Sequence, residues 1–223
     1  MKQLFTIDLK NYDDDWKHSR RDSARAVIHV GDDKLALVYA TKHGYYKVPG
    51  GGIHEGEDKL VALAREVQEE VGLVIVPESV REFGVASRYQ KSGLTENTAF
   101  VQDNFYYECE VENNENGELK IISQNLDDYE DKAGFELRIV SIKEAALANR
   151  QYRDTSDFNI VMIARDTRVL EMMAGLKSEP SRCMAELLVE CGVAKKSRSV
   201  ARTLLCGGSG GGENCACGKS ELR

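Results

Sequence analysis

Apolar and polar residues alternate along much of the first 150 residues, which is the pattern of half-buried β-strands. The first two apolar runs are separated by Gly31-Asp32-Asp33, a turn sequence that predicts a β-hairpin. In two other segments the apolar residues recur every three to four positions, as they do on one face of a helix. We predict strands at residues 24–30, 34–40, 80–90, 98–112 and 135–142, and helices at residues 58–71 and 143–149.

The order of these elements predicts an α/β (α+β) domain over residues 23–150, built as a mixed β-sheet sandwiched between helices. Residues 1–22 show no periodicity, and we expect them to form an N-terminal arm or a short edge strand. The acidic segment 125–132 is expected to be a loop that leads into the last strand.

A C-terminal helical extension is expected at residues 151–205. It would begin with an amphipathic helix capped by Thr155 or Ser156, and Pro180 would open a second helix. Residues 206–223 are rich in Gly and Cys, cannot bury a core, and are expected to form a disordered tail.

The charge balance limits the kind of partner. The 223 residues carry a formal net charge of −7, which argues against non-specific binding to nucleic acid. No run of 18 apolar residues is present, and the charged N-terminus does not resemble a signal peptide, so we expect a cytoplasmic protein with reduced cysteines. Cys206, Cys215 and Cys217 lack the spacing and the fourth ligand of a zinc site.

The segment REVQEEVGL, residues 65–73, concentrates acidic residues on the first predicted helix. Glu66, Glu69 and Glu70 share one arc, because positions three and four apart are neighbours on a helix. Arg65 can reach Glu69, but no other cation lies at helical spacing. A solvated helix face would explain one acidic arc. A divalent cation such as Mg²⁺ would explain why the repulsion is tolerated, since hard cations bind carboxylate oxygens.

The turn before this helix supports a metal–phosphate site. Residues 49–52 read Pro-Gly-Gly-Gly, which allows a tight turn and a close approach of backbone groups to a ligand. A plain connecting turn would have the same composition, but this one leads directly into the carboxylate helix.

Together these residues resemble a complete Nudix box. Gly51 is followed after five residues by Glu57 and after seven more by the segment 65–73, so that seven fixed residues and two aliphatic positions agree. The resemblance implies a Nudix-type fold over residues 23–150 and says little about residues 151–223. Two departures from the usual pattern, Tyr46 where Trp is often found and His54 at a frequently acidic position, do not involve the metal ligands.

The resemblance also implies roles for individual residues. Nudix enzymes use Mg²⁺ or Mn²⁺ to hydrolyse a nucleoside diphosphate linked to another group. The metal ligands carried over from the family are Glu66, Glu69, Glu70 and the backbone carbonyl of Gly50. Arg65 would orient the carboxylates and Glu57 would be a supporting acid, while Gly72 would end the helix in a left-handed conformation.

The general base is left open by the family, which uses either a glutamate of the box or an acid on a later loop. Glu66 is the first candidate, and the later acids are Glu136, Asp127, Asp128 and Glu130, each of which is also typical of a solvated loop. Aromatic residues that could bind a base are Tyr45, Tyr89 and Phe105, but alternating strand positions are more typical of core residues.

Two functions remain from the sequence. The first is an Mg²⁺-dependent pyrophosphohydrolase with a small nucleotide substrate, without a nucleic-acid or membrane partner and with a possible homodimer. The second is a catalytically silent nucleotide sensor that signals through its C-terminal helices. The intact box favours the enzyme, because a sensor need not keep every acid.

Overall fold

A mixed β-sheet forms the centre of the chain in the computed structural model, which describes residues 1–152 and 157–177 and, at residues 157–160, the backbone only. The described strands are β1 (Gln3–Asp8), β2 (Lys17–Arg20), β3 (Ser23–His29), β4 (Lys34–Ala40), β5 (Tyr45–Lys47), β6 (Gly50–Gly52), β7 (Arg81–Lys91), β8 (Thr98–Cys109) and β9 (Phe135–Ser141). The described helices are α1 (Lys59–Val71), the 3₁₀ turn η1 (Pro77–Ser79), α2 (Asp128–Ala133), α3 (Ile142–Gln151) and α4 (Asp157–Met173).

The main path of the sheet runs β1-β7-β8-β3-β4-β5, with β2 beside β8, β6 beside β3 and β9 beside β4. The hairpin predicted at Gly31 is confirmed, because β3 and β4 pair antiparallel. β3 pairs in parallel with β8 and antiparallel with β6, and the second pairing joins the turn that precedes α1 to the middle of the sheet. The predicted mixed sheet flanked by helices is therefore confirmed.

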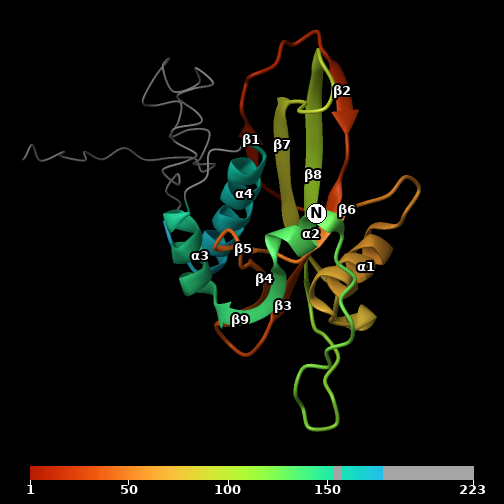
Figure 1. Cartoon of the computed structure of the whole chain (residues 1–223), viewed down its shortest axis with the longest axis vertical. Helices are drawn as coiled ribbons and strands as arrows, with labels where there is room; N and C mark the ends of the chain where they lie inside the picture. Colours follow the sequence, from red (N-terminus) through yellow and green to blue (C-terminus); the bar gives the residue numbers. More distant parts are fainter. Residues whose placement is uncertain (153–156, 178–223) are drawn as a thin grey trace, which may run out of the picture.

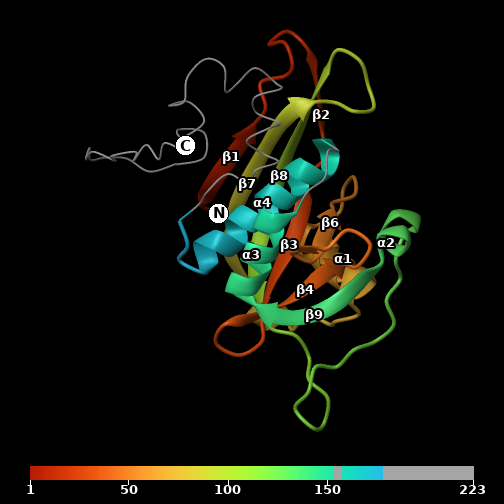
Figure 2. The same cartoon turned by 60° about the vertical axis from the view of Figure 1, so that its left-hand side comes forward.

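Helices cover both faces of the sheet. Figure 1 shows α1 on one side and α3 with α4 on the other, and Figure 2 shows α3 and α4 lying across the strands. Two apolar clusters correspond to these faces: Leu63 and Val67 of α1 belong to one, and Ala145 of α3 and Leu170 of α4 belong to the other. Successive side chains of β3 point to opposite faces of the sheet. Ala26 therefore packs in the first cluster and Val27 in the second.

Local signals fix both ends of α1. The Asp58 carboxylate accepts a hydrogen bond from the Leu60 amide (2.8 Å), which satisfies a backbone donor at the N-terminus. Gly72 ends the helix with φ +67°, the left-handed conformation that glycine adopts most easily. The predicted glycine stop is confirmed.

The first 22 residues, expected as an arm or a short edge strand, contribute two strands to the sheet. β1 pairs in parallel with β7, and β2 pairs in parallel with β8. Phe5, Ile7 and Leu9 are buried in the apolar cluster beneath α3 and α4. This segment therefore contributes to the core.

The acidic segment expected as a loop at residues 125–132 contains a helix, and that expectation is wrong. α2 begins with a capping box in which the Asp127 carboxylate accepts from the Glu130 amide and the Glu130 carboxylate accepts from the Asp127 amide. This reciprocal pair satisfies two backbone donors at once, which is enough to start a short helix in a polar sequence. Gly134, with φ +68°, ends it.

The helix expected to be amphipathic near residues 155–176 is α4, and its described side chains are mostly buried. From Val161 to Glu171 only Ala164 is partly exposed. The charged side chains in this stretch turn inward, and Arg165 donates to the neighbouring Asp166 carboxylate (2.8 Å). The proposed caps Thr155 and Ser156, the helix after Pro180 and the Gly/Cys tail lie outside the described residues. No helix in residues 1–152 or 157–177 is long and apolar enough to cross a membrane.

β5 ends the main path of the sheet, and a side chain from α3 occupies its outer edge. The buried Asn149 side chain accepts from the Tyr46 amide (2.7 Å) and donates to the Tyr46 carbonyl (2.8 Å). One amide side chain thus makes the two hydrogen bonds that a neighbouring strand would otherwise make. This contact fixes β5, and with it the adjacent Lys47, against α3.

Candidate active site

The acidic face of α1 packs against the turn formed by β5 and β6. Glu70 is 1% exposed, and its Oε2 accepts a hydrogen bond from the Gly50 amide (2.8 Å). Its Oε1 forms an ion pair with Nζ of Lys47, which enters from β5. This buried carboxylate therefore joins the helix to the turn.

Arg65 connects most of the other acidic residues. Its Nε and Nη2 donate to the two oxygens of Glu57, each at 2.9 Å. Its Nη1 donates to Glu66 at 2.8 Å and to Glu69 at 3.0 Å. Its Nη2 also reaches the Gly52 carbonyl (3.1 Å). A planar guanidinium can make these contacts together because its donors point outward in a fixed fork.

The environment shifts the ionisation of these groups in opposite directions. The hydrogen bonds from Arg65 and from the His54 amide lower the pKa of Glu57 to about 2. Burial raises the pKa of Glu66, as does the negative charge of Glu70, although Arg65 acts against the shift. Glu57 is therefore held as a carboxylate, whereas burial opposes the ionisation of Glu66.

The glycines of the turn are required by close contacts. Gly50 has φ +133°, and a Cβ there would overlap the backbone of Ala24 and Arg25. A Cβ on Gly51 would overlap the carboxylate of Glu66. The carbonyl of Gly50 accepts a hydrogen bond from Nη1 of the buried Arg25 (2.7 Å). The turn is thus held between β3 and α1, with its backbone directly against the acidic residues.

The segment before α2 closes over the C-terminal half of α1. The Asn125 amide donates to the Glu69 carbonyl (2.9 Å), and the Gln124 side chain donates to the Glu70 carbonyl. Glu130 lies within electrostatic reach of Glu70 and Lys47. Burial, followed by the charge of Glu70, raises the pKa of Glu130 to about 7. This segment places an additional acid that can change protonation near neutral pH.

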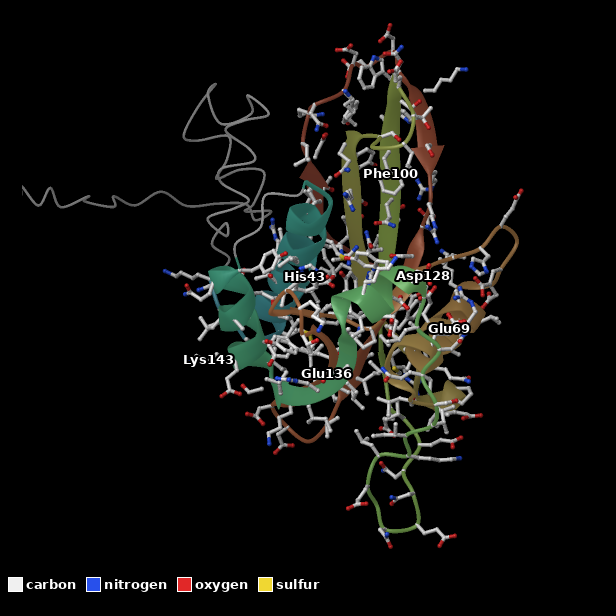
Figure 3. The ribbon with its side chains drawn as sticks, in the orientation of Figure 1. His43, Glu69, Phe100, Asp128, Glu136 and Lys143 are labelled. Atoms are coloured by element: carbon white, nitrogen blue, oxygen red, sulfur yellow. The ribbon has the colours of Figure 1, made fainter. Side chains whose placement is uncertain are left out.

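The residues chosen from the sequence fall into two groups. The structure brings together the box residues Gly50, Glu57, Arg65, Glu66, Glu69 and Glu70 through the contacts described above. Glu136 lies on β9, where it pairs with Arg138, and Figure 3 shows it apart from Glu69 of α1. Among the aromatic candidates, Tyr45 is fully buried in the core.

Several contributors were missed in the sequence. Lys47 supplies Glu70 with a cation from another element, so the expectation that this carboxylate lacks a basic partner holds only along the helix. The sequence did contain a signal for this pair, because Lys47 lies between apolar strand residues in Tyr-Tyr-Lys-Val. A strand buried on both faces cannot hold an unpaired ammonium, so a lysine there indicates a buried acidic partner. Arg25 and Gln124 gave no comparable signal, since their contacts join segments distant in sequence.

The carboxylate oxygens at this site are the type of ligand that a hard divalent cation binds. Four carboxylates, those of Glu57, Glu66, Glu69 and Glu70, form their ion pairs within the described residues with two cations, Arg65 and Lys47. As they stand, no three His, Cys, Asp or Glu side chains in residues 1–152 and 157–177 form a group that could hold a metal ion. Arg65 and Lys47 occupy the oxygens, so a metal would have to replace those contacts.

Comparisons with known proteins bear on the family of this chain. A family model described as NUDIX domain matches residues 19–158. A NUDIX hydrolase from Nitrosomonas europaea is 21% identical, with 73% of this chain and 93% of that chain covered and a TM-score of 0.41. A candidate Nudix hydrolase from Chromobacterium violaceum is 22% identical, with coverage of 83% and 95% and a TM-score of 0.39. At these TM-scores, the similarity to the two solved structures carries no argument about the fold or the function of this chain. A search of curated proteins found no match.

Proposed function

The chain belongs to the NUDIX domain family, and we propose that it is a divalent-cation-dependent pyrophosphohydrolase for a nucleoside diphosphate linked to another group. Membership of the family makes it a hydrolase of phosphorus-containing anhydrides. The preferred metal, Mg²⁺ with Mn²⁺ as a substitute, and the nucleotide nature of the substrate are proposed.

One observation carries the proposal: the excess of carboxylates over cations at the point where α1 meets the glycine turn. The acids that would hold the metal are Glu66, Glu69 and Glu70. The Gly50 carbonyl, which accepts from Arg25 in this structure, would be a further oxygen ligand. The bound metal would neutralise charge on the phosphate oxygens and lower the pKa of bound water.

The protein's own groups have separate tasks. Arg65 fixes the positions of Glu66 and Glu69 and is held in turn by Glu57. Lys47 compensates Glu70 in a buried position, where an isolated carboxylate would be costly. We therefore assign Arg65, Glu57 and Lys47 to orienting the carboxylates.

We propose Glu130 as the general base that accepts the proton of the attacking water. A base is most effective when its pKa lies near the working pH, and that of Glu130 is about 7. Glu66 is paired with the Arg65 guanidinium and Glu136 with that of Arg138 on β9, whereas the Glu130 carboxylate accepts from the neutral Asp127 amide. Among these acids Glu130 best combines a position near the acidic face with a suitable pKa.

The test is a panel of nucleoside triphosphates, nucleotide sugars and dinucleotide polyphosphates, assayed for release of nucleoside monophosphate with Mg²⁺, with Mn²⁺ and with EDTA. We expect turnover of at least one class with metal and none with EDTA. Glu69→Gln should lower kcat at least about 100-fold without changing the far-UV circular dichroism spectrum. Glu144→Gln, an exposed acid of α3, is the matched control.

Full activity of Glu69→Gln would refute the site assignment. Tight binding of a nucleotide with no turnover of any substrate would refute the enzyme and leave the sensor. The homodimer stays a prediction, and the proposed cytoplasmic location rests on the sequence alone.

A further inference from the structure

A buried carboxylate of α4 reaches the glycine turn from the face of the sheet opposite α1. Asp166 is 1% exposed, and its Oδ2 accepts a hydrogen bond from the Val48 amide (3.2 Å). Val48 stands two residues before Gly50, whose carbonyl is the proposed oxygen ligand of the metal. Because α1 lies on the other face (Figure 1), this contact joins α4 to the turn that packs against the acidic residues.

Arg25 of β3 makes a second link between the same carboxylate and the turn. Its Nη1 donates to the carbonyl of Val48 (3.2 Å) and to that of Gly50 (2.7 Å). Burial and the charge of Arg165 lower the pKa of Arg25, whereas the charge of Asp166 acts against this shift. Asp166 therefore compensates the guanidinium that holds both carbonyls of the turn.

Two buried side chains, those of Tyr106 and Arg165, hold the Asp166 carboxylate in place. Its Oδ1 accepts from the Tyr106 hydroxyl (2.7 Å) and from Nε of Arg165 (2.8 Å). Arg165 is fixed in turn, because its Nη1 donates to Oδ1 of the buried Asn104 (2.6 Å). Although burial acts against ionisation, the charges of Arg165 and Arg25 hold the pKa of Asp166 below its ordinary value. The carboxylate is thus fixed in both position and charge.

The Gly50 carbonyl can serve Arg25 and a metal ion together, because a carbonyl oxygen has two lone pairs. A metal bound by this carbonyl would share it with the positive charge of Arg25, and like charges repel. The Asp166 carboxylate is buried with Arg25 and offsets that repulsion. A negative charge on the α4 side of the turn therefore favours a cation on the α1 side.

We propose that Asp166 is a positioning residue for the metal, which fixes the backbone of the turn and offsets the charge of Arg25 so that the Gly50 carbonyl is available as a ligand. This inference rests on the proposed metal-dependent hydrolase and adds a contribution from α4. Asp166 lies beyond residues 19–158, which the family model matches, so the match does not include this residue.

The test variant is Asp166→Asn, which keeps the size of the side chain and removes its charge. An amide side chain has one acceptor oxygen where a carboxylate has two. Since Tyr106 and Arg165 both donate to Oδ1, we expect the amide oxygen at that position. The NH₂ group would then face the Val48 amide, donor against donor, and the bond to the turn would be lost.

Isothermal titration with Mn²⁺, without substrate and well below the melting temperature, measures the metal affinity directly. We expect Kd for Mn²⁺ to rise about tenfold or more in Asp166→Asn, since groups that orient metal ligands contribute about 10- to 100-fold to metal affinity. In the activity assay the variant should need correspondingly more Mn²⁺. At saturating Mn²⁺ its kcat should stay within about twofold of the wild type, because the carboxylates of α1 are intact.

Glu171→Gln is the matched control, because it also removes the charge of a buried acid on α4. Glu171 is 1% exposed and accepts from Nε of Arg150 (2.7 Å), so this partner lies on α3 and not on the glycine turn. The control should lose stability and keep Kd for Mn²⁺ within about twofold of the wild type. Equal rises in Kd in the two variants would indicate general destabilisation of α4 and overturn the positioning role.

Tyr106→Phe is a milder variant, which tests the proposal even if Asp166→Asn does not fold. It removes one donor to Asp166 and keeps the carboxylate, so Kd for Mn²⁺ should rise only about threefold. If Asp166→Asn does not fold, an unchanged Kd in Tyr106→Phe overturns the proposal.

The same titrations separate this proposal from the hydrolase itself. Mn²⁺ binding that is equal in the wild type and Asp166→Asn overturns the positioning role and leaves the metal-dependent hydrolase. Absence of Mn²⁺ binding by the wild type overturns the metal site, and the positioning role with it.

Discussion

Removing Lys47 tests how the acidic site is held without metal. Its ammonium and the Glu70 carboxylate are 7% and 1% exposed, so the pair is essentially buried. Lys47→Met keeps most of the apolar stem, but it leaves Glu70 with the Gly50 amide as its remaining side-chain donor among the described contacts. Removing one partner of a buried ion pair costs about 3–5 kcal/mol, because the other charge stays buried and uncompensated.

The assays are thermal unfolding and guanidinium chloride unfolding in EDTA, each followed by far-UV circular dichroism. For a chain of this size about 1 kcal/mol corresponds to about 2–4 °C in Tm, so the melting temperature should fall by about 10 °C. Lys143→Met, an exposed lysine at the start of α3 that is labelled in Figure 3, should change stability by less than about 0.5 kcal/mol.

A double-mutant cycle separates the ion pair from general packing. Lys47→Met with Glu70→Gln should cost less than the sum of the single changes, because the neutral amide no longer needs a cation. A Lys47→Met cost below about 1 kcal/mol, or additive single changes, would refute the buried pair. If the carboxylates also hold Mg²⁺, the single variant should gain more stability from added Mg²⁺ than the wild type, because Lys47 no longer competes for Glu70.

Two further predictions concern protonation. Glu57 has a folded pKa of about 2 against an ordinary 4.5, so its stabilising contribution is complete above about pH 5 and is lost as the pH falls through 2. The difference in unfolding free energy between the wild type and Glu57→Gln should shrink accordingly in acid denaturation, and a difference that is constant down to pH 2 would contradict it. Glu130→Gln should lower kcat about 100-fold or more and remove the acidic limb of the pH–rate profile near pH 7, since activity requires the carboxylate. Glutamine can keep the capping box with Asp127, so an unchanged limb would exclude Glu130 as the base rather than indicate an unfolded α2.

Short-range patterns in the sequence predicted most of the central elements. The alternation in β3 and β4 and the periodicity of α1 predict their types, because each pattern reports which side of an element is buried. The failure at α2 has a local cause as well. Asp127 and Glu130 stand three residues apart as a capping pair, and the acidic composition of the segment concealed that signal.

The candidate site was predictable as far as it follows the helix. Glu66, Glu69 and Glu70 share a face because of helical geometry alone. Lys47 and Arg25 could not be placed from spacing, because their contacts depend on how β5 and β3 lie against α1 and the glycine turn.

The edge of β5 has a consequence for solubility. An open strand edge presents unpaired amides and carbonyls on which another chain can add a strand, which is a common route to aggregation. By bonding both backbone groups of Tyr46, Asn149 closes part of that edge with a side chain of α3. Replacing Asn149 by leucine would remove both bonds and expose this template, at a point on β5 next to the Lys47 that pairs with Glu70.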